Sequence, residues 1–214
     1  MPIPKNWAEE LILEWLTLKG YMAQSNVRLK SGRRGGVKEA DIIGLRLVKE
    51  PREAKGKKMM AEVLEILHVE VGNLTGGFNE NFNRVKNKFS RDRIEAVKSF
   101  SLDVVELESV PGKFWLGCSR LGVSYVKYMP LYIATYVAEK QANKLKRELN
   151  KHGIKFLTLK EALREIMNDI DEWKERQVRK GFRKTKDITL MESLWLLNLI
   201  DYMKGEGIIS IKEN

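Results

Sequence analysis

Apolar residues near the start of the chain recur with the 3.6-residue spacing of an amphipathic helix. The stripe consists of Trp7, Ala8, Leu11, Ile12, Trp15, Leu16 and Leu18. Pro4 stands before it and Gly20 follows it, which is the preferred asymmetry of helix ends. The pattern therefore predicts one helix between these two residues.

Short aliphatic and β-branched runs, bounded by turn or charged residues, predict strands. The clearest runs of this kind are residues 40–48 and 63–71, and we also expect strands at 22–29, 104–107, 114–116, 124–128 and 154–157. The segment 49–61 is rich in lysine and contains Pro51 and Gly56, so we expect a solvated hairpin loop between two strands there.

Helical patterns occupy most of the remaining chain. They cover residues 80–89, 91–100, 138–150, 159–179 and 189–204. Alternation of strands and helices predicts an α/β fold, with a central sheet flanked by helices. We expect one α/β domain over residues 1–160 and a helical C-terminal extension, residues 161–214, packed on the same core.

Composition narrows the class of protein. Hydrophobic residues make up 43% of the chain, enough for a core, which excludes wholesale disorder. The net charge of +10 favours a polyanionic partner, nucleic acid before an anionic membrane surface. The apolar stretches at 128–138 and 194–200 are too short to span a bilayer.

Cysteine usage and the N-terminus indicate a cytoplasmic setting. Cys118 is the single cysteine, which excludes an internal disulfide and a cysteine-rich metal site in this chain. The first residues lack the pattern of a signal peptide. Prominent lysine and glutamate are typical of proteins from hot environments.

Two acidic residues stand in apolar strand patterns. Asp41 precedes an aliphatic run, and Glu70 is flanked on both sides by valine. A buried carboxylate is costly unless something compensates its charge. Neighbouring strands that each carry one carboxylate can converge on Mg²⁺ or Mn²⁺, which prefer oxygen ligands.

The N-terminal helix adds a resemblance to a known family. Ala8, Glu9, Leu11, Gly20 and Tyr21 match the opening motif of archaeal Holliday-junction resolvases, within the PD-(D/E)XK nuclease superfamily. The resemblance covers roughly residues 5–100. It implies a restriction-endonuclease-like mixed sheet, with Glu9, Asp41 and Glu70 as catalytic residues and metal ligands. The implied activity is Mg²⁺-dependent hydrolysis of DNA phosphodiester bonds, with a preference for branched or otherwise structured DNA.

The sequence departs from that family at two positions. Ala40 replaces the proline before Asp41, and Gly72 stands where the family has a lysine that orients or helps deprotonate the attacking water. Two interpretations remain open: an active nuclease, or a nuclease-derived module that binds nucleic acid without cleaving it. A helical interaction protein built around the final helix leaves the acidic pair unexplained.

Other residues could replace the missing lysine. His68 shares a strand face with Glu70, as an auxiliary base or phosphate contact, or as a core histidine bonded to a backbone carbonyl. Lys86 and Lys88 could reach back from the following helix, or lie on a solvated face. Glu53 begins a Glu-Ala-Lys run with the family's spacing, but a nearby proline makes it a poor central strand.

Basic residues cluster on either side of the acidic pair. We expect phosphate contacts, with DNA rather than RNA, although each could be ordinary surface charge. The candidates are Arg28, Lys30, Arg33, Arg34, Arg84, Lys86 and Lys88, with Arg91 and Arg93 nearby. A homodimer could form through residues 128–137 or 194–200, unless these runs are buried core.

Overall fold

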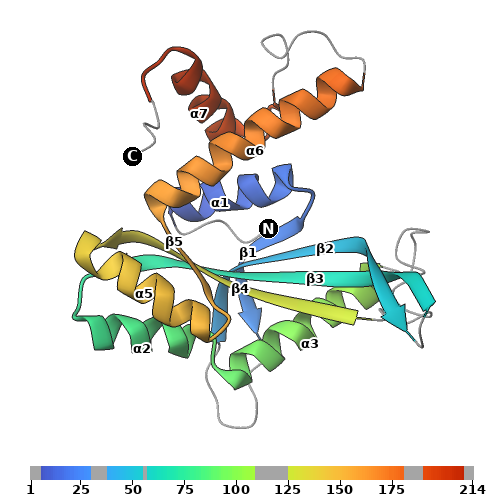
Figure 1. The fold of residues 1–214 in the computed structure, drawn as a ribbon, viewed down its shortest axis with the longest axis horizontal. Helices are drawn as coiled ribbons and strands as arrows, with labels where there is room; N and C mark the ends of the chain where they lie inside the picture. Colours follow the sequence, from blue (N-terminus) through green and yellow to red (C-terminus); the bar gives the residue numbers. More distant parts are fainter. Residues whose placement is uncertain (1–5, 30–37, 55–56, 109–124, 181–189, 210–214) are drawn as a thin grey trace.

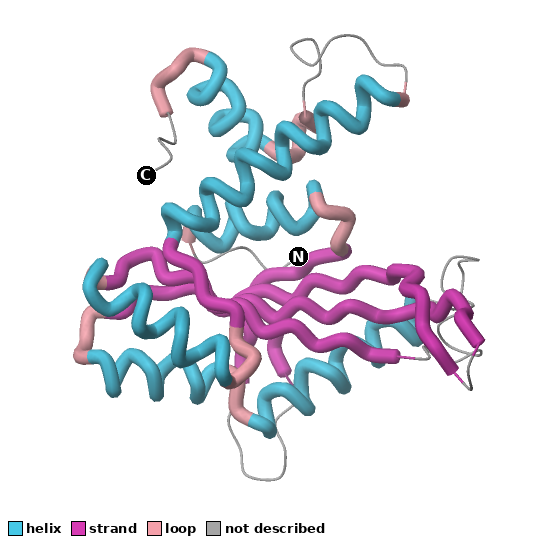
Figure 2. The backbone as a smooth tube through the Cα atoms, viewed as in Figure 1, coloured by secondary structure: helices cyan, strands magenta, loops and turns pink. Residues whose placement is uncertain are grey.

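A five-stranded mixed sheet forms the centre of the molecule (Figures 1 and 2). The computed structural model describes residues 6–29, 38–54, 57–108, 125–180 and 190–209. Strands β1 (Met22–Leu29), β2 (Lys38–Ala54) and β3 (Lys57–Leu74) form an antiparallel meander. Strands β4 (Tyr125–Val137) and β5 (Lys155–Thr158) continue the sheet in parallel with β3, in the order β1-β2-β3-β4-β5.

Helices cover both faces of the sheet (Figure 1). On one face lie α1 (Trp7–Leu18), α6 (Leu159–Arg179) and α7 (Trp195–Gly205). On the other lie α2 (Phe78–Lys88), α3 (Arg91–Glu108) and α5 (Glu139–Lys151). The mixed α/β sheet flanked by helices agrees with the prediction from the sequence.

The first helix forms as its sequence predicts. Asn6 is the N-cap, and its Oδ1 accepts hydrogen bonds from the backbone N–H groups of Ala8 and Glu9 at 3.0 Å each. Gly20 follows the helix with φ 79°, a left-handed conformation that glycine adopts without steric cost. The apolar stripe of α1 is buried against the sheet, α6 and α7, except for Trp7 at its start, which is exposed.

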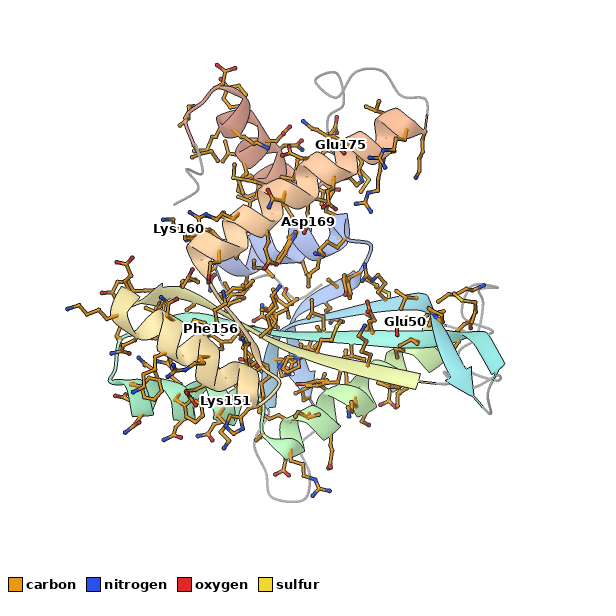
Figure 3. All side chains as sticks on the ribbon, viewed as in Figure 1. Glu50, Lys151, Phe156, Lys160, Asp169 and Glu175 are labelled. Carbon is orange, nitrogen blue, oxygen red and sulfur yellow. The ribbon has the colours of Figure 1, made fainter. Side chains whose placement is uncertain are left out.

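The C-terminal helices share a core with α1. Residues of α6 and α7 belong to the same buried cluster as Leu11, Ile12 and Trp15. Asp169 of α6 is labelled in Figure 3, and its Oδ2 accepts hydrogen bonds from Trp15 Nε1 at 2.6 Å and Lys19 Nζ at 2.9 Å. No helix among the described residues is long and apolar enough to cross a membrane.

The hairpin loop expected at residues 49–61 is wrong. β2 and β3 continue through this segment as a long two-stranded ribbon, with Pro51 opposite Met60 and Lys49 opposite Glu62. Glu50, labelled in Figure 3, lies on this ribbon. Opposite charges paired across antiparallel strands stabilise such a ribbon, which composition alone did not reveal.

Two further expectations need correction. Residues 104–107 belong to α3 rather than to a strand, because extending an existing helix requires no new nucleation. The last helix begins at Trp195, six residues later than the predicted start at 189. The strand expected at 114–116 lies outside the described residues.

The two runs considered as dimer interfaces differ in their exposure. Within residues 128–137, Leu131, Tyr132, Ile133 and Ala134 of β4 are buried. Leu197 and Ile200 of α7 are buried as well, whereas Leu199 and Tyr202 are exposed. The structure therefore assigns residues 131–134 of β4 to the core, whereas Tyr136 of β4 and one side of α7 lie on the surface.

Candidate functional site

Glu70 of β3 is the most enclosed charged residue of the site. Its side chain is 0% exposed. Oε1 accepts from His68 Nε2 at 3.0 Å and from Arg93 Nη2 at 3.3 Å, and Oε2 accepts from Lys88 Nζ at 2.5 Å. Burial alone would raise the pKa of Glu70, but the hydrogen bond from His68 and the charge of Lys88 outweigh it. The pKa is therefore below its usual value, and Glu70 is a carboxylate at neutral pH.

His68 holds Glu70 from within the core. Its ring is fully buried, and Nδ1 lies 2.6 Å from the Tyr128 hydroxyl. Burial lowers the pKa of His68, so the ring is neutral. The tautomer that satisfies both contacts carries its proton on Nε2, donates to Glu70 and accepts from Tyr128.

The structure favours the alternative of a core histidine over the expected role of His68 as an auxiliary base or phosphate contact, because no part of the ring reaches the surface. The alternative of a core histidine holds, although its partners are side chains rather than a backbone carbonyl. The shared strand face of His68 and Glu70 is confirmed by their direct contact.

Asp41 of β2 lies beside Glu70 on the neighbouring strand. Burial and then the charge of Glu70 raise its pKa to about 6. The backbone N–H of Val71, which donates to Asp41 Oδ2 at 2.9 Å, and the charge of Lys88 oppose this shift. Asp41 thus carries a negative charge that its surroundings compensate only in part.

Glu9 brings a third carboxylate to this region from α1. The side chain is buried, and its Oε1 accepts a hydrogen bond from Asn6 Nδ2 at 2.9 Å. The charge of Glu9 is among the causes that raise the pKa of Asp41, so the two groups interact. The three acids singled out in the sequence are therefore electrostatically coupled through Asp41.

Tyr132 lies over Gly72, the position at which the nucleases that the N-terminal motif resembles have a lysine. A Cβ atom at Gly72 would lie 2.9 Å from the Tyr132 hydroxyl oxygen. Tyr132 is 2% exposed, so it has little room to move away. A lysine therefore does not fit at position 72 without displacement of this tyrosine.

Lys88 brings an ammonium group to the Glu70 carboxylate. It comes from the last turn of α2 and contacts Glu70. Of the two possibilities that the sequence left open for this lysine, reaching back toward the acidic residues or lying on a solvated face, the structure shows the first. Lys86 is exposed and lies over the Phe82 ring, with Nζ 5.9 Å from the centroid. Glu53 stands 12 positions after Asp41 on β2, which is roughly 40 Å along an extended strand.

The donor atoms of the site fit a hard divalent cation by their chemistry, since all are carboxylate oxygens. Their arrangement differs from a formed metal centre. Within the described ranges, no group of three or more His, Cys, Asp or Glu side chains is placed to hold a metal ion. Both oxygens of Glu70 instead face Lys88, Arg93 and His68.

The structure describes some of the basic residues that were predicted to contact phosphate, and others lie outside the described residues. Arg28 is well exposed, with Nε 4.0 Å from Glu39 Oε1. Arg84 and Lys86 are exposed on α2, and Arg91 is exposed at the start of α3. Lys30, Arg33 and Arg34 lie outside the described residues.

Three residues near the acids were not predicted. Tyr128 and Tyr132 come from β4, whose parallel register with β3 the sequence does not reveal. Asn26 of β1 has φ 51° and stands between the pairs Ser25–Ile42 and Val27–Ala40, opposite Asp41. A non-glycine residue in the left-handed region is uncommon, and such residues concentrate at functional sites.

Comparisons with known proteins do not add to this geometry: no family model matches the chain, and no curated protein and no solved structure matches it.

Proposed function

We propose that this chain is a metal-dependent endonuclease with a restriction-endonuclease-like fold, which hydrolyses DNA phosphodiester bonds. The observation that carries the proposal is the contact of Lys88 Nζ with Glu70 Oε2 at 2.5 Å, beside the coupled carboxylate of Asp41. One lysine and two carboxylates on adjacent strands are the groups that the resemblance leads us to expect. Here the lysine comes from a helix instead of from β3.

The order of elements supports the finer assignment of the fold. A helix, an antiparallel three-stranded meander, helices and then a strand parallel to β3 follow one another, as in the nucleases that the N-terminal motif resembles. Asp41 and Glu70 lie on two adjacent interior strands of this arrangement, β2 and β3. The net charge of +10 supports a polyanionic substrate.

Each residue has a defined part in the proposed reaction. Asp41, Glu70 and Glu9 would hold Mg²⁺ or Mn²⁺, which supplies Lewis-acid activation of the phosphodiester and lowers the pKa of bound water. Lys88 is placed to orient the attacking water or to stabilise charge on the phosphate. His68 and Tyr128 position Glu70 through a buried chain of hydrogen bonds.

The test is a cleavage assay on labelled duplex, branched and single-stranded DNA with Mg²⁺, Mn²⁺ or EDTA. We expect metal-dependent cutting by the native protein that an Asp41→Ala/Glu70→Ala double variant loses. Lys88→Met should lower the cutting rate by about 10²-fold or more, whereas the matched control Lys86→Met should lower it only slightly. Equal rates for the two lysine variants would remove Lys88 from the mechanism.

The hydrogen bonds that occupy both carboxylate oxygens of Glu70 favour a second function. Because Gly72 carries no lysine and both oxygens of Glu70 are engaged by the protein, the chain could be a module that binds nucleic acid without cleaving it. Salt-sensitive binding to all three DNA substrates, with no cutting in either metal, would establish this alternative. If neither cutting nor salt-sensitive binding occurs, both functions are wrong.

A further inference from the structure

Glu70 holds two cationic side chains that come from different helices. Lys88 ends α2, and Arg93 lies in the first turns of α3, directly after the turn that joins the two helices. Both donate to Glu70, and Arg93 also donates to the backbone carbonyl of Glu39. The two cations thus converge on one carboxylate at the junction of α2 and α3.

This junction has unused capacity to bind an anion. The Nε atom of Arg93 is buried and has no hydrogen-bond partner among the residues that the structure describes. An unpaired buried donor costs free energy, and an anion with several acceptor oxygens would satisfy it. Lys88 is 35% exposed, so an anion can approach its ammonium group from solvent.

A DNA phosphate matches these donors better than Glu70 does. Arginine binds phosphate in bidentate geometry, and lysine is a common partner of phosphate. Glu70 offers only two oxygens, and Oε1 already accepts from His68. A phosphate can therefore take over both cations while His68 keeps the Glu70 carboxylate in place.

We propose that Lys88 and Arg93 form a binding site for one backbone phosphate of DNA, and that Glu70 keeps this site closed in the free protein by pairing with both cations. The inference rests on the proposed function and adds the order in which the site is assembled. When the phosphate binds, the two cations leave Glu70 for the phosphate oxygens. The carboxylate of Glu70 is then uncompensated beside Asp41 and ready to bind a divalent cation.

This exchange couples the two ligands of the site. DNA and a metal ion can each bind only after the ion pairs of Glu70 with Lys88 and Arg93 break. The first ligand to bind therefore loses the free energy of breaking them, and the second ligand does not. Coupling of this kind is reciprocal, because the two binding free energies share one term. The free protein should therefore bind metal weakly, and DNA should strengthen metal binding.

The test compares two variants that remove the same charge. Glu70→Gln keeps an oxygen for the His68 donor but releases Lys88 and Arg93, whereas Asp41→Asn removes a neighbouring charge that accepts from the Val71 N–H and interacts with Lys88 only at longer range. Affinity for a labelled DNA duplex is measured in EDTA over a range of salt concentrations. Circular dichroism and thermal melting establish that both variants are folded.

We expect Glu70→Gln to bind DNA about tenfold more tightly than the native protein, and Asp41→Asn to change affinity by about threefold at most. The slope of log affinity against log salt should steepen by about one in Glu70→Gln, since one newly neutralised phosphate adds about 0.9. Adding Lys88→Met to Glu70→Gln should reverse most of the gain. Equal effects of Glu70→Gln and Asp41→Asn, with unchanged slopes, would overturn the proposal.

A second measurement does not depend on Glu70 variants. Binding of Mn²⁺ to the DNA-free protein is followed by electron paramagnetic resonance for Lys88→Met and for the exposed control Lys86→Met. Removal of the pairing cation should strengthen Mn²⁺ binding several-fold in Lys88→Met only, and equal binding by both would overturn the closed state. A native protein that cuts DNA but fails these tests would refute this inference alone, whereas absence of any DNA binding would refute the proposed function.

Discussion

Tyr132 reaches from β4 toward Gly72 of β3, and its hydroxyl oxygen occupies the space that a side chain at position 72 would need. We predict that Gly72→Ala destabilises the protein by about 1–3 kcal/mol, because a Cβ atom 2.9 Å from this oxygen forces a buried tyrosine to shift. Urea denaturation measures the change in the free energy of unfolding.

The tyrosine hydroxyl provides the control for this substitution. Without it, the nearest atom to a Cβ at Gly72 is Tyr132 Cζ at 3.8 Å, which is an ordinary contact. Gly72→Ala should therefore lower the free energy of unfolding much less in a Tyr132→Phe background than in the native protein. A double-mutant cycle measures this difference as a coupling free energy between the two positions. Additive effects of the two substitutions would show that Tyr132 does not limit position 72.

Asp41 gives the site a pH dependence whose sign follows from its raised pKa. The folded-state pKa is about 6 and the ordinary value is 3.8, so the folded protein binds more protons than the unfolded chain between these pH values. The contribution of Asp41 to stability is present below about pH 4 and is lost as pH rises through 6. Asp41→Asn removes this titration but keeps an acceptor for the Val71 N–H.

We therefore predict that Asp41→Asn gains stability relative to the native protein as pH rises from about 4 to about 7. The gain should reach about 1–3 kcal/mol, since one unit of pKa shift corresponds to about 1.4 kcal/mol. Urea titrations at several pH values measure the difference. A difference that stays constant over this range would mean that Asp41 has an ordinary pKa.

At the scale of elements, α1 provides the N-terminal cap of α7. The N-cap residue of α7, Leu194, makes no side-chain capping bond. Glu14 of α1 takes this role, accepting from the backbone N–H groups of Leu196 at 3.2 Å and Leu197 at 3.0 Å. A carboxylate at a helix N-terminus also interacts favourably with the helix dipole.

Removal of this contact should loosen α7. We predict that Glu14→Ala lowers the free energy of unfolding by about 1–2 kcal/mol and increases hydrogen exchange in residues 195–205. The control is Glu172→Ala, at an exposed position of α6, which should change stability by less than about 0.5 kcal/mol. Unchanged exchange in α7 would show that apolar packing alone holds this helix.

Across the whole molecule, the two faces of the sheet are covered by helices from distant parts of the chain. α1 and the C-terminal helices α6 and α7 lie together over one face of the sheet (Figure 2). Their side chains form one buried cluster with residues of β2, β3 and β4. Sharing a core in this way couples the stability of both ends of the chain.

We therefore predict one cooperative unfolding transition for the full chain. Far-ultraviolet circular dichroism and tryptophan fluorescence should give the same midpoint in urea, because Trp15 lies in the shared cluster. Separate transitions, with α6 and α7 losing protection first, would show that the C-terminal helices form an independent unit.

Local patterns determined much of the fold. The spacing of apolar residues in α1 and α6, and the aliphatic runs in β2 and β3, depend on neighbours within a few positions, which the sequence contains. The ribbon at residues 49–61 depends on pairing between β2 and β3, and local composition does not show this pairing. Likewise, α3 continues through residues 104–108 by extension of an existing helix, where the local pattern predicted a strand. The same limit applies to the register of β4 beside β3.

The sequence by itself identified Glu9, Asp41 and Glu70, because a carboxylate in an apolar pattern needs a compensating partner wherever the chain places it. Only the tertiary structure decided which partners these are. Lys88, Arg93, His68 and Tyr128 surround Glu70 from α2, α3, β3 and β4. Contacts between separate elements depend on sheet order and helix packing, and no local pattern in the sequence encodes either.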